Sequence, residues 1–227
     1  MTATLALKGL RLDVNVEKLY SGEKTSGFRV FKGDASPFFL KVFHHRLTLK
    51  GVLSSFFLST RPAREFKYSK LLRERGFPVP EVFAFHSRRL FGLFPVNIGY
   101  TKAVFLDGLI PLDKLTGDKN FSSYLKEAIL LLARLHREGF IHKDASLSNF
   151  ALYKGTVFLI DLEGISKVFL FSTKVKNLVD FLNDCLKYNI EFNLEVAVEL
   201  YTENAGIKPR KERFLNKILK MVAERKR

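Results

Sequence analysis

The sequence contains one cysteine, Cys185, in 227 residues. A single cysteine rules out an internal disulfide framework and a cysteine-based zinc cluster, and it fits a reducing compartment. The opening residues, MTATLALKGLRLD, lack a charged segment followed by a long apolar one, so no secretory signal is expected. The longest strongly apolar helical run, AILLLA, stops at Arg134 and is far too short to span a bilayer. A cytoplasmic location is therefore expected.

Acidic residues are also scarce. There are 23 Asp and Glu against 38 Lys and Arg, which gives a formal net charge of +15. Such a charge favours anionic partners: nucleotides, nucleic acid, phosphorylated glycans or an acidic membrane surface. A generally basic, soluble surface is the alternative. Because most of the aromatic residues are phenylalanines in apolar runs, a role in the core is favoured over base stacking, and no nucleic-acid partner is expected.

The first half of the chain, without repeats or low-complexity segments, has the pattern of strands with one helix. Residues 10–43 contain Phe- and Val-rich runs separated by GDASP, which has the composition of a turn. A helix is predicted from about 59 to 76, with Ser59 or Thr60 as its cap, Pro62 in its first turn and Gly76 at its end. Further strands are predicted up to residue 106. This part, 1–106, is expected to form a β-rich lobe.

The second half changes to a helical pattern after a Gly-, Pro- and Asp-rich connector at 107–118. Between 120 and 139 four apolar residues follow helical spacing: Leu125, Ile129, Leu132 and Leu135. A hairpin with a Lys154-Gly155 turn follows, and helices are expected from about Thr173 onward. Residues 107–227 are thus expected to form a mainly helical lobe. The fold class is predicted to be α+β and two-lobed, and clefts between lobes are frequent ligand sites.

The segment HREGFIHKDASLSNFALYKGTVFLIDLEG, residues 136–164, contains the pattern H-x-D-x4-N followed by a strand that ends in Asp. Phosphoryl transfer needs a carboxylate near the acceptor hydroxyl, oxygen ligands for magnesium and cations on the phosphates. Asp144 can take the first role, and Asn149 and Asp161 the second. Alternatively, Asp144 caps a turn, Asn149 is a turn residue and Asp161 ends a strand.

The first half of the chain contains a lysine and two glycines that could contact the phosphates. Lys41 lies inside the apolar run FFLKVF, so it needs a partner or must reach a cleft. Glu65, on the following predicted helix, can pair with it, as in the Lys–Glu pair with which kinases position nucleotide phosphates. The alternative is an edge lysine and a solvated acid. Gly22 and Gly27 could cover phosphates, although G-x-G-x-x-G is absent.

The segments STRPAREFKYSKLLRERGFPVPEVFAF, GFIHKDASLSNFAL and LIDLEG together resemble the bacterial lipopolysaccharide core sugar kinases, the Kdo and heptose kinases, which are relatives of the eukaryotic-type protein kinases. The resemblance covers roughly Leu19 to Leu186. It implies a single kinase-like domain with a small antiparallel β-rich N-lobe containing one helix, a helical C-lobe and a short activation segment. It also implies an enzyme that uses ATP and Mg²⁺. The implied roles are phosphate binding for Lys41, its positioning by Glu65, catalytic base for Asp144, and metal binding for Asn149 and Asp161.

The resemblance also implies an adenine-facing hinge near Val104–Leu106 and a ribose contact from Asp113. The chain departs from protein kinases at Lys143, which replaces an Arg, and at the metal segment D-L-E-G, where Glu163 is either an added ligand or a polar turn residue. No A-P-E element follows Gly164, which favours a small or glycan acceptor over a docked peptide. A zinc site at His136 and His142 is not expected, and His142 is expected to pack under the catalytic loop.

The acceptor implied by the resemblance is an anionic, lipid-linked glycan. The last segment, PRKERFLNKILKMVAERKR, is predicted to be a basic amphipathic helix that packs on its own domain or lies on the inner membrane surface. Two other hypotheses remain open at this stage. The chain could be a small serine/threonine protein kinase of the same fold, or a catalytically weak kinase-like protein that binds RNA or acts as a scaffold.

Overall fold

The computed structural model describes residues 15–32, 35–44, 59–90, 94–188, 190, 192–206, 218 and 220. The chain divides into two compact units, Met1–Asp107 and Gly108–Arg227. The described part of the first unit is an antiparallel sheet with one helix, and that of the second is mainly helical with short strands. The predicted α+β class is therefore confirmed.

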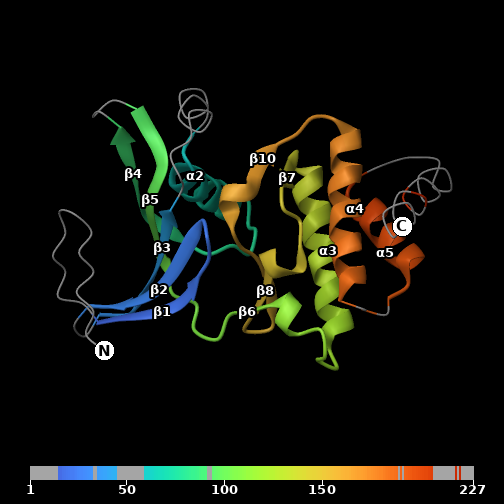
Figure 1. The fold of residues 1–227 in the computed structure, drawn as a ribbon. Coiled ribbons are helices and arrows are strands. Elements are labelled where there is room, and N and C mark those ends of the chain that lie inside the picture. The colour runs from blue at the N-terminus through green and yellow to red at the C-terminus, as the bar shows by residue number, and fades with distance from the viewer. Residues whose placement is uncertain are drawn as a thin grey trace. The chain divides into compact units, whose positions relative to one another are not determined.

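The first unit is built on five strands: β1 Asn15–Ser21, β2 Thr25–Phe31, β3 Phe38–His44, β4 Val82–Leu90 and β5 Phe94–Val104 (Figure 1). They pair in the order β1-β2-β3-β5-β4, and every pair is antiparallel. Strand β3 is central, and its residues from Leu40 to Phe43 are all buried. Because successive side chains point to opposite faces, Lys41 and Phe43 lie on the face opposite to Leu40 and Val42.

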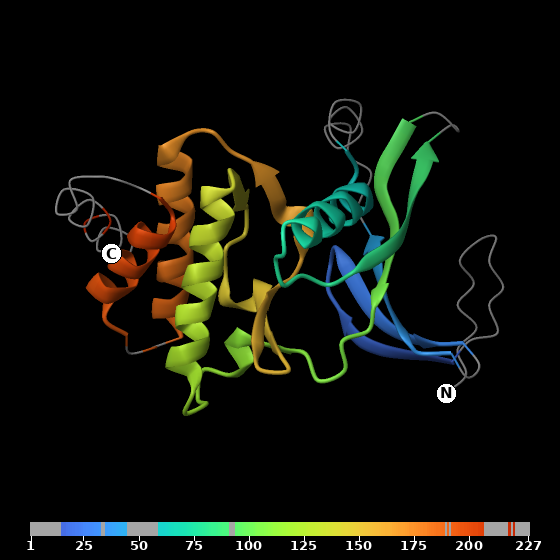
Figure 2. The same ribbon diagram turned by 180° about the vertical axis from the view of Figure 1, so that it is seen from behind.

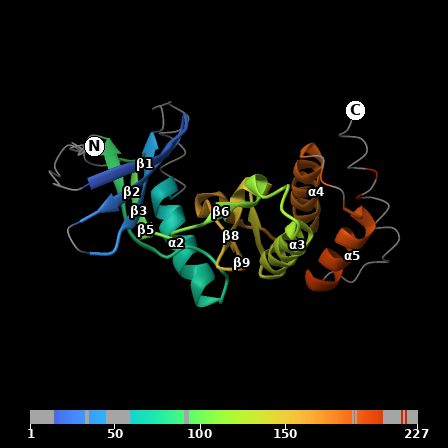
Figure 3. The ribbon, with the colours of Figure 1, turned by 90° about the horizontal axis from the view of Figure 1, so that it is seen from below.

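Helix α2, Arg61–Glu74, lies against β4 and β5 (Figure 3). Pro62 occupies its first turn and Gly76, with φ of 71°, follows its end, both as predicted. The predicted cap is wrong. Thr60 stands at the cap position but makes no capping hydrogen bond, and its hydroxyl pairs with that of Ser87 instead. The backbone N–H of Arg61 donates to Asn97 Oδ1 at 2.8 Å, so the cap comes from β5.

The second unit contains helices α3 Phe121–Arg137, α4 Phe171–Lys187 and α5 Leu194–Asn204. Helices α3 and α4 run beside each other, and α5 packs against α3 (Figure 2). The four apolar residues predicted to share one face of α3 are all buried, which confirms that prediction. Helix α4 begins at Phe171, two residues before the predicted start. Gly139, with φ of 81°, follows α3 in the left-handed conformation that glycine adopts most readily.

Short elements in the second unit carry the residues of the predicted site. They are β6 Ile110–Pro111, β7 Phe140–His142, β8 Phe150–Tyr153, β9 Thr156–Leu159 and β10 Ile165–Lys167, with 3-10 turns η1 Leu112–Lys114, η2 Leu147–Asn149 and η3 Leu162–Gly164. Strands β8 and β9 form the predicted hairpin. Its turn residues Lys154 and Gly155 have φ of 47° and 80°, the pair of positive values that a type I′ turn requires.

In the parts of the chain that the structure describes, no helix is long and apolar enough to cross a membrane. The predicted basic C-terminal helix lies almost entirely outside the described residues. The two that are described there, Ile218 and Lys220, are helical, and Ile218 is fully buried while Lys220 is exposed.

Candidate active site

Lys41 and Glu65 meet inside the first unit. The Nζ atom of Lys41 on β3 lies 3.2 Å from Glu65 Oε2 on α2, and the two side chains are only 6% and 10% exposed. Lys41 Nζ also lies 5.1 Å from the centre of the Phe43 ring. Burying two charges costs solvation energy that their mutual attraction does not reliably recover, so such a pair is weak evidence for stability. The pairing of Lys41 with Glu65 is as the sequence predicts, and the role of the lysine in phosphate binding stays a prediction.

The two predicted phosphate-covering glycines occupy different settings. Gly22 lies in the turn between β1 and β2, where its N–H donates to the Thr25 carbonyl at 2.8 Å. Gly27 lies within β2, opposite Lys41 on β3. A Cβ atom at Gly27 would overlap the ring of Tyr20. The absence of a side chain at position 27 is therefore explained by the close approach of Tyr20.

The predicted hinge and ribose residues fall at the ends of the two units. Val104 ends β5, and its N–H donates to the Glu81 carbonyl at 2.9 Å; Leu106 is half-buried two residues later. Asp113 belongs to the second unit, in η1. Its Oδ1 is buried without a hydrogen-bond partner among the described residues, and its charge helps to raise the pKa of Tyr188 at the end of α4, after the larger effect of desolvation.

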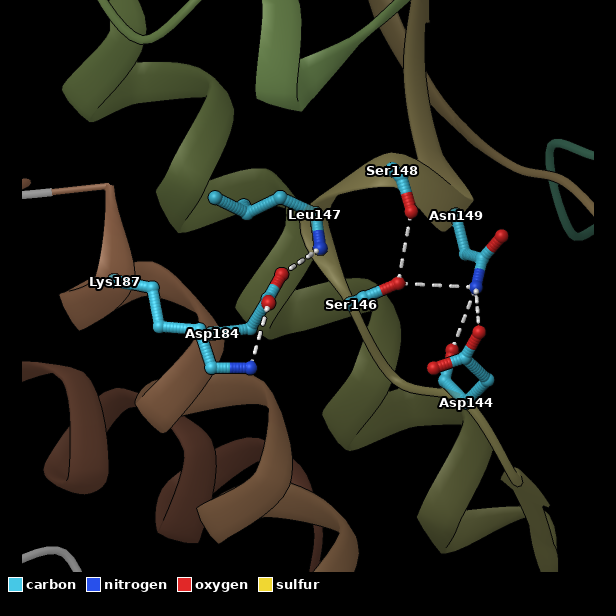
Figure 4. Close-up of polar contacts among 7 residues, drawn as sticks. All are labelled: Asp144, Ser146, Leu147, Ser148, Asn149, Asp184 and Lys187. Atoms are coloured by element: carbon cyan, nitrogen blue, oxygen red, sulfur yellow. Dashed lines mark hydrogen bonds and ion pairs between the residues drawn. The ribbon is translucent and has the colours of Figure 1, made fainter. Parts of the chain in front are cut away.

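The loop from Asp144 to Asn149 is held by its own side chains (Figure 4). Asn149 Nδ2 donates to the Asp144 carbonyl at 2.7 Å, to Ser146 Oγ at 3.1 Å and to Asp144 Oδ2 at 3.3 Å. The amide nitrogen thus points into the loop, and Figure 4 shows the amide oxygen directed away from Asp144. Asp144 is exposed while Asn149 is buried. The exposed carboxylate of Asp144 is thus accessible to an acceptor. The amide oxygen of Asn149 is directed away from Asp144, as a metal ligand would be.

Asp161 is joined to this loop through the backbone. The N–H of its neighbour Ile160 donates to the Asn149 carbonyl at 2.9 Å. Asp161 has φ of 56° and ψ of 50°, the left-handed conformation. Among non-glycine residues this conformation is uncommon, Asp and Asn tolerate it best, and it is found preferentially at functional sites. The structure therefore brings Asp144, Asn149 and Asp161 together in the second unit.

His142 packs under the loop, as the sequence predicts. Its Nε2 lies 3.2 Å from the carbonyl oxygen of Ile160 and 3.1 Å from that of Asp161, so the imidazole holds the strand end that carries Asp161. Gly164 lies over this ring, since a Cβ there would come within 2.9 Å of His142 Cε1. The Gly of D-L-E-G is thus required by close packing on His142.

A chain of three buried polar side chains supports His142 from the helices. The Tyr201 hydroxyl donates to His136 Nδ1 at 2.6 Å, His136 Nε2 donates to Asn177 Oδ1 at 2.9 Å, and Asn177 Nδ2 donates to the His142 carbonyl at 2.6 Å. Burial lowers the pKa of His136 to about 4; the hydrogen bond to Asn177 acts in the opposite direction and the charge of Lys174 acts in the same one. His136 is therefore neutral at pH 7, and the protein uses it as a structural link.

Sequence reasoning missed this link and also missed Asp184 on α4. Asp184 Oδ2 accepts a hydrogen bond from the Leu147 N–H at 2.9 Å, and its Oδ1 lies 3.6 Å from Lys187 Nζ (Figure 4). The carboxylate thus anchors the middle of the loop that carries Asp144 and Asn149. No local signal could have found it, because 37 residues separate the two partners.

The donor atoms suit magnesium. In the described residues, no group of three or more His, Cys, Asp and Glu side chains is placed to hold a metal. Magnesium usually takes one or two carboxylate or carbonyl oxygens from the protein and the rest from phosphate and water, so Asn149 and Asp161 fit as a pair. Glu163 lies in η3, two residues beyond Asp161, and is buried rather than solvated, with 4% exposure.

No family model and no curated protein matches the sequence. Solved structures do match. One is a structure of WaaP in complex with acyl carrier protein, with a TM-score of 0.64 at 17% identity, covering 94% of this chain and 88% of that one. Another is Rio2 kinase from Chaetomium thermophilum in a complex with ADP, Mg²⁺ and phosphoaspartate, with a TM-score of 0.55 at 17% identity, covering 97% and 75%. A second Rio2 kinase structure from the same organism has a TM-score of 0.57. The resemblance expected from the sequence is thus confirmed at the level of the fold: the chain has a protein-kinase-like fold, similar to those of WaaP and Rio2 kinase.

Proposed function

We propose that the protein is an ATP- and magnesium-dependent kinase that phosphorylates a sugar hydroxyl, on Kdo or heptose, in the inner core of lipopolysaccharide. The kinase-like fold supports the reaction class. The acceptor class is supported by the resemblance of three sequence segments to lipopolysaccharide core sugar kinases and by the net charge of +15, which suits an anionic substrate. In this proposal the protein works in the cytoplasm, at the inner face of the membrane where such a lipid-linked acceptor is exposed.

The roles follow from the chemistry of each group. Lys41, positioned by Glu65, holds nucleotide phosphates. The further nucleotide contacts of the proposal are Gly22, Gly27, Val104, Leu106 and Asp113. Magnesium supplies charge neutralisation on the phosphates when bound. Asn149 and Asp161 offer oxygen ligands to it. Asp144 orients the sugar hydroxyl and accepts its proton.

The orientation of Asn149 is the observation that carries the proposal. An ordinary turn asparagine would use either end of its amide to stabilise the turn. Here the nitrogen binds three atoms of the loop, two of them on Asp144, and the oxygen is directed away from Asp144. Through Ile160 the same residue is tied to Asp161, whose left-handed backbone marks a strained position. A metal site beside a catalytic carboxylate accounts for both features.

The test separates nucleotide binding from transfer. Wild type, Asp161→Asn and Asp144→Asn are assayed for Mg²⁺-dependent ADP binding and for transfer of label from γ-labelled ATP to core glycolipid. Asparagine tolerates the left-handed conformation at 161, so Asp161→Asn keeps the backbone while it removes the charge and one accepting oxygen. It should weaken Mg²⁺-dependent binding. Asp144→Asn should leave binding intact and lower transfer by about 10²–10⁴-fold.

Two outcomes would contradict the proposal. Labelling of a basic protein in place of the glycolipid would indicate a protein kinase, and binding of nucleotide with no transfer to either would indicate a binding protein. Since WaaP was solved with acyl carrier protein, a binding assay with acyl carrier protein belongs in the same series as a test for a protein partner.

A further inference from the structure

The segment joining β10 to α4 exposes three consecutive large apolar side chains. Phe169 is 93% exposed, Leu170 68% and Phe171 45%. Among the other described residues, no large apolar side chain is more than 50% exposed. Single exposed apolar residues are ordinary on a protein surface, but a contiguous group that includes an almost fully solvated phenylalanine marks an interaction site. We call Phe169, Leu170 and Phe171 the apolar tip.

The apolar tip is held in place on both sides. Val168, just before it, is buried, and its N–H donates to the Gly139 carbonyl at 2.8 Å. Beyond it, the Thr173 N–H donates to the Leu170 carbonyl at 3.2 Å in the first turn of α4. Figure 2 shows this segment crossing from β10 to the start of α4. The tip therefore projects from an anchored segment, with a defined position on the second unit.

The segments next to the apolar tip carry more basic than acidic residues. The hydrogen bond between Val168 and Gly139 places the tip next to the end of α3, and the hydrogen bond between His136 and Asn177 joins that end of α3 to α4. Within 134–139 and 165–176 there is one acidic residue, Glu138, and five basic ones, Arg134, Arg137, Lys167, Lys174 and Lys176. Arg137 donates to the Asn204 carbonyl at the end of α5, whereas Lys167 and Lys176, on either side of the tip in the sequence, are exposed.

Stabilisation of the helices does not explain all of these charges. Cations at the end of α3 suit the helix dipole, but cations near the start of a helix do not. The first turn of α4 has no acidic residue, and Lys174 and Lys176 follow it directly. Lys174 and Lys176 lie just beyond the first turn, where the dipole effect has largely fallen off, so the helix itself does not call for them and an anionic partner would.

We propose that the apolar tip inserts into an anionic lipid bilayer while the exposed side chains of Lys167 and Lys176 contact its headgroups. A bilayer interface offers an apolar layer beneath negative charge, which matches both features. A folded protein partner normally covers about 800 Å² on each side. Leu170 and Phe171 are already partly buried, so the three side chains together can supply only part of that area, and the bilayer is favoured.

The position of the tip gives insertion a role at the proposed site. Phe169 lies eight residues beyond Asp161, so the two are at most about 29 Å apart even along a fully extended chain. Insertion would hold Asp144 and Asp161, in the same unit, near the membrane surface where a lipid-linked acceptor resides. This step rests on the proposed function, whereas insertion itself does not.

The chain contains no tryptophan, which makes insertion directly measurable. Phe169→Trp introduces a single tryptophan, at the tip, which can be excited selectively over the seven tyrosines at about 295 nm. The matched control is Val196→Trp on α5, at a position that is 50% exposed in the same unit. With vesicles of equimolar phosphatidylcholine and phosphatidylglycerol, tryptophan emission should shift to the blue and be quenched by brominated acyl chains at 169 and not at 196. No shift at 169, or equal shifts at both, overturns insertion. A shift with a soluble acidic protein and not with vesicles overturns it in favour of a protein partner.

A second variant tests the link to the acceptor. Phe169→Ser/Leu170→Ser/Phe171→Ser should bind these vesicles at least about tenfold more weakly, and Val196→Ser should bind as wild type does. Mg²⁺-dependent ADP binding should be unchanged in both. The triple variant should phosphorylate core oligosaccharide freed of lipid as wild type does, but lipid-linked core in vesicles at least about tenfold more slowly. If the triple variant phosphorylates both acceptors as fast as wild type does, the link between insertion and the acceptor is overturned and the proposed kinase stands. Insertion of wild type without transfer to either acceptor contradicts the kinase and leaves insertion standing.

Discussion

The two units place their candidate site residues by different means. In the first unit the important contacts join residues far apart in sequence: Lys41 with Glu65, and Asn97 with the N–H of Arg61, 36 residues away. In the second unit the loop of Asp144 and Asn149 is closed by contacts three to five residues apart. The first unit therefore depends on its tertiary fold to place a charge, while the second builds much of its site from one short segment.

The difference extends to the kind of group that is buried. Lys41 and Glu65 are both charged when paired, and each is costly to bury without the other. The Tyr201–His136–Asn177 chain is neutral, and each of its hydrogen bonds has a suitable donor and acceptor. Breaking the charged pair should thus cause the largest loss of stability. That loss of stability should not depend on the protonation of a histidine.

Lys41→Met is expected to have the largest effect. Removing one member of a buried ion pair typically costs about 3–5 kcal/mol of stability, and nucleotide binding should be lost with the lysine. The double variant Lys41→Met/Glu65→Leu should recover most of the stability without recovering binding. Urea unfolding and ADP titration of both variants measure the two effects. An unchanged free energy of unfolding in Lys41→Met would show that the pair is not closed in solution.

The neutral Tyr201–His136–Asn177 hydrogen-bond chain predicts a pH dependence of stability that the ion pair does not. His136 has a pKa of about 4 in the folded protein against about 6.5 in an unfolded chain. Between these values the unfolded chain binds a proton that the folded protein excludes. The free energy of unfolding should therefore fall as the pH drops from 6.5 towards 4, by roughly 3 kcal/mol in total, with no such contribution above 6.5.

Urea unfolding across this pH range, compared between wild type and His136→Gln, isolates the contribution of the histidine. Tyr201→Phe is the matched control, because it weakens the same chain but keeps the buried imidazole. It should lose stability at every pH and retain the slope. A slope in His136→Gln equal to that of wild type would assign the pH dependence to other groups.

The same contrast explains what could be predicted from sequence. The α3 stripe, the Lys154-Gly155 turn and H-x-D-x4-N were readable because each depends on neighbours along the chain. The buried face of helix α2 was harder to predict, since it includes Glu65 and Ser69 beside Leu72 and so is not marked by apolar residues alone. Ser69 satisfies its hydroxyl with Pro80 and Val82, a contact without an apolar signature.

Asp184→Ala should have an intermediate effect, because it removes an anchor of the loop without touching its reacting groups. Displacement of that loop should lower the rate of transfer by about 10–100-fold with little change in Mg²⁺-dependent ADP binding. Asp184→Asn retains an oxygen that can accept from the Leu147 N–H and should restore most of the rate. A rate that falls equally in both variants would show that charge, and not the hydrogen bond to the loop, is what matters at this position.

The smallest expected effect concerns helix caps, where the two units differ again. Helix α5 is capped locally, since Asn193 Oδ1 accepts from the N–H groups of Glu195 and Val196 at 2.9 and 3.1 Å. Helix α2 is capped by Asn97, which lies on strand β5. Asn97→Ala and Asn193→Ala should each cost about 1 kcal/mol in urea unfolding.

Ser59, one of the two caps that the sequence suggested for α2, provides the control for this comparison. Ser59→Ala alters an exposed side chain that does not cap α2, so it should change stability by less than about 0.5 kcal/mol. Asn97→Asp keeps an accepting oxygen and adds a negative charge near the start of the helix, which the helix dipole favours, so it should match or exceed wild type. A larger loss of stability from Ser59→Ala than from Asn97→Ala would show that a neighbouring residue caps α2. The two units would then not differ in how their helices are capped.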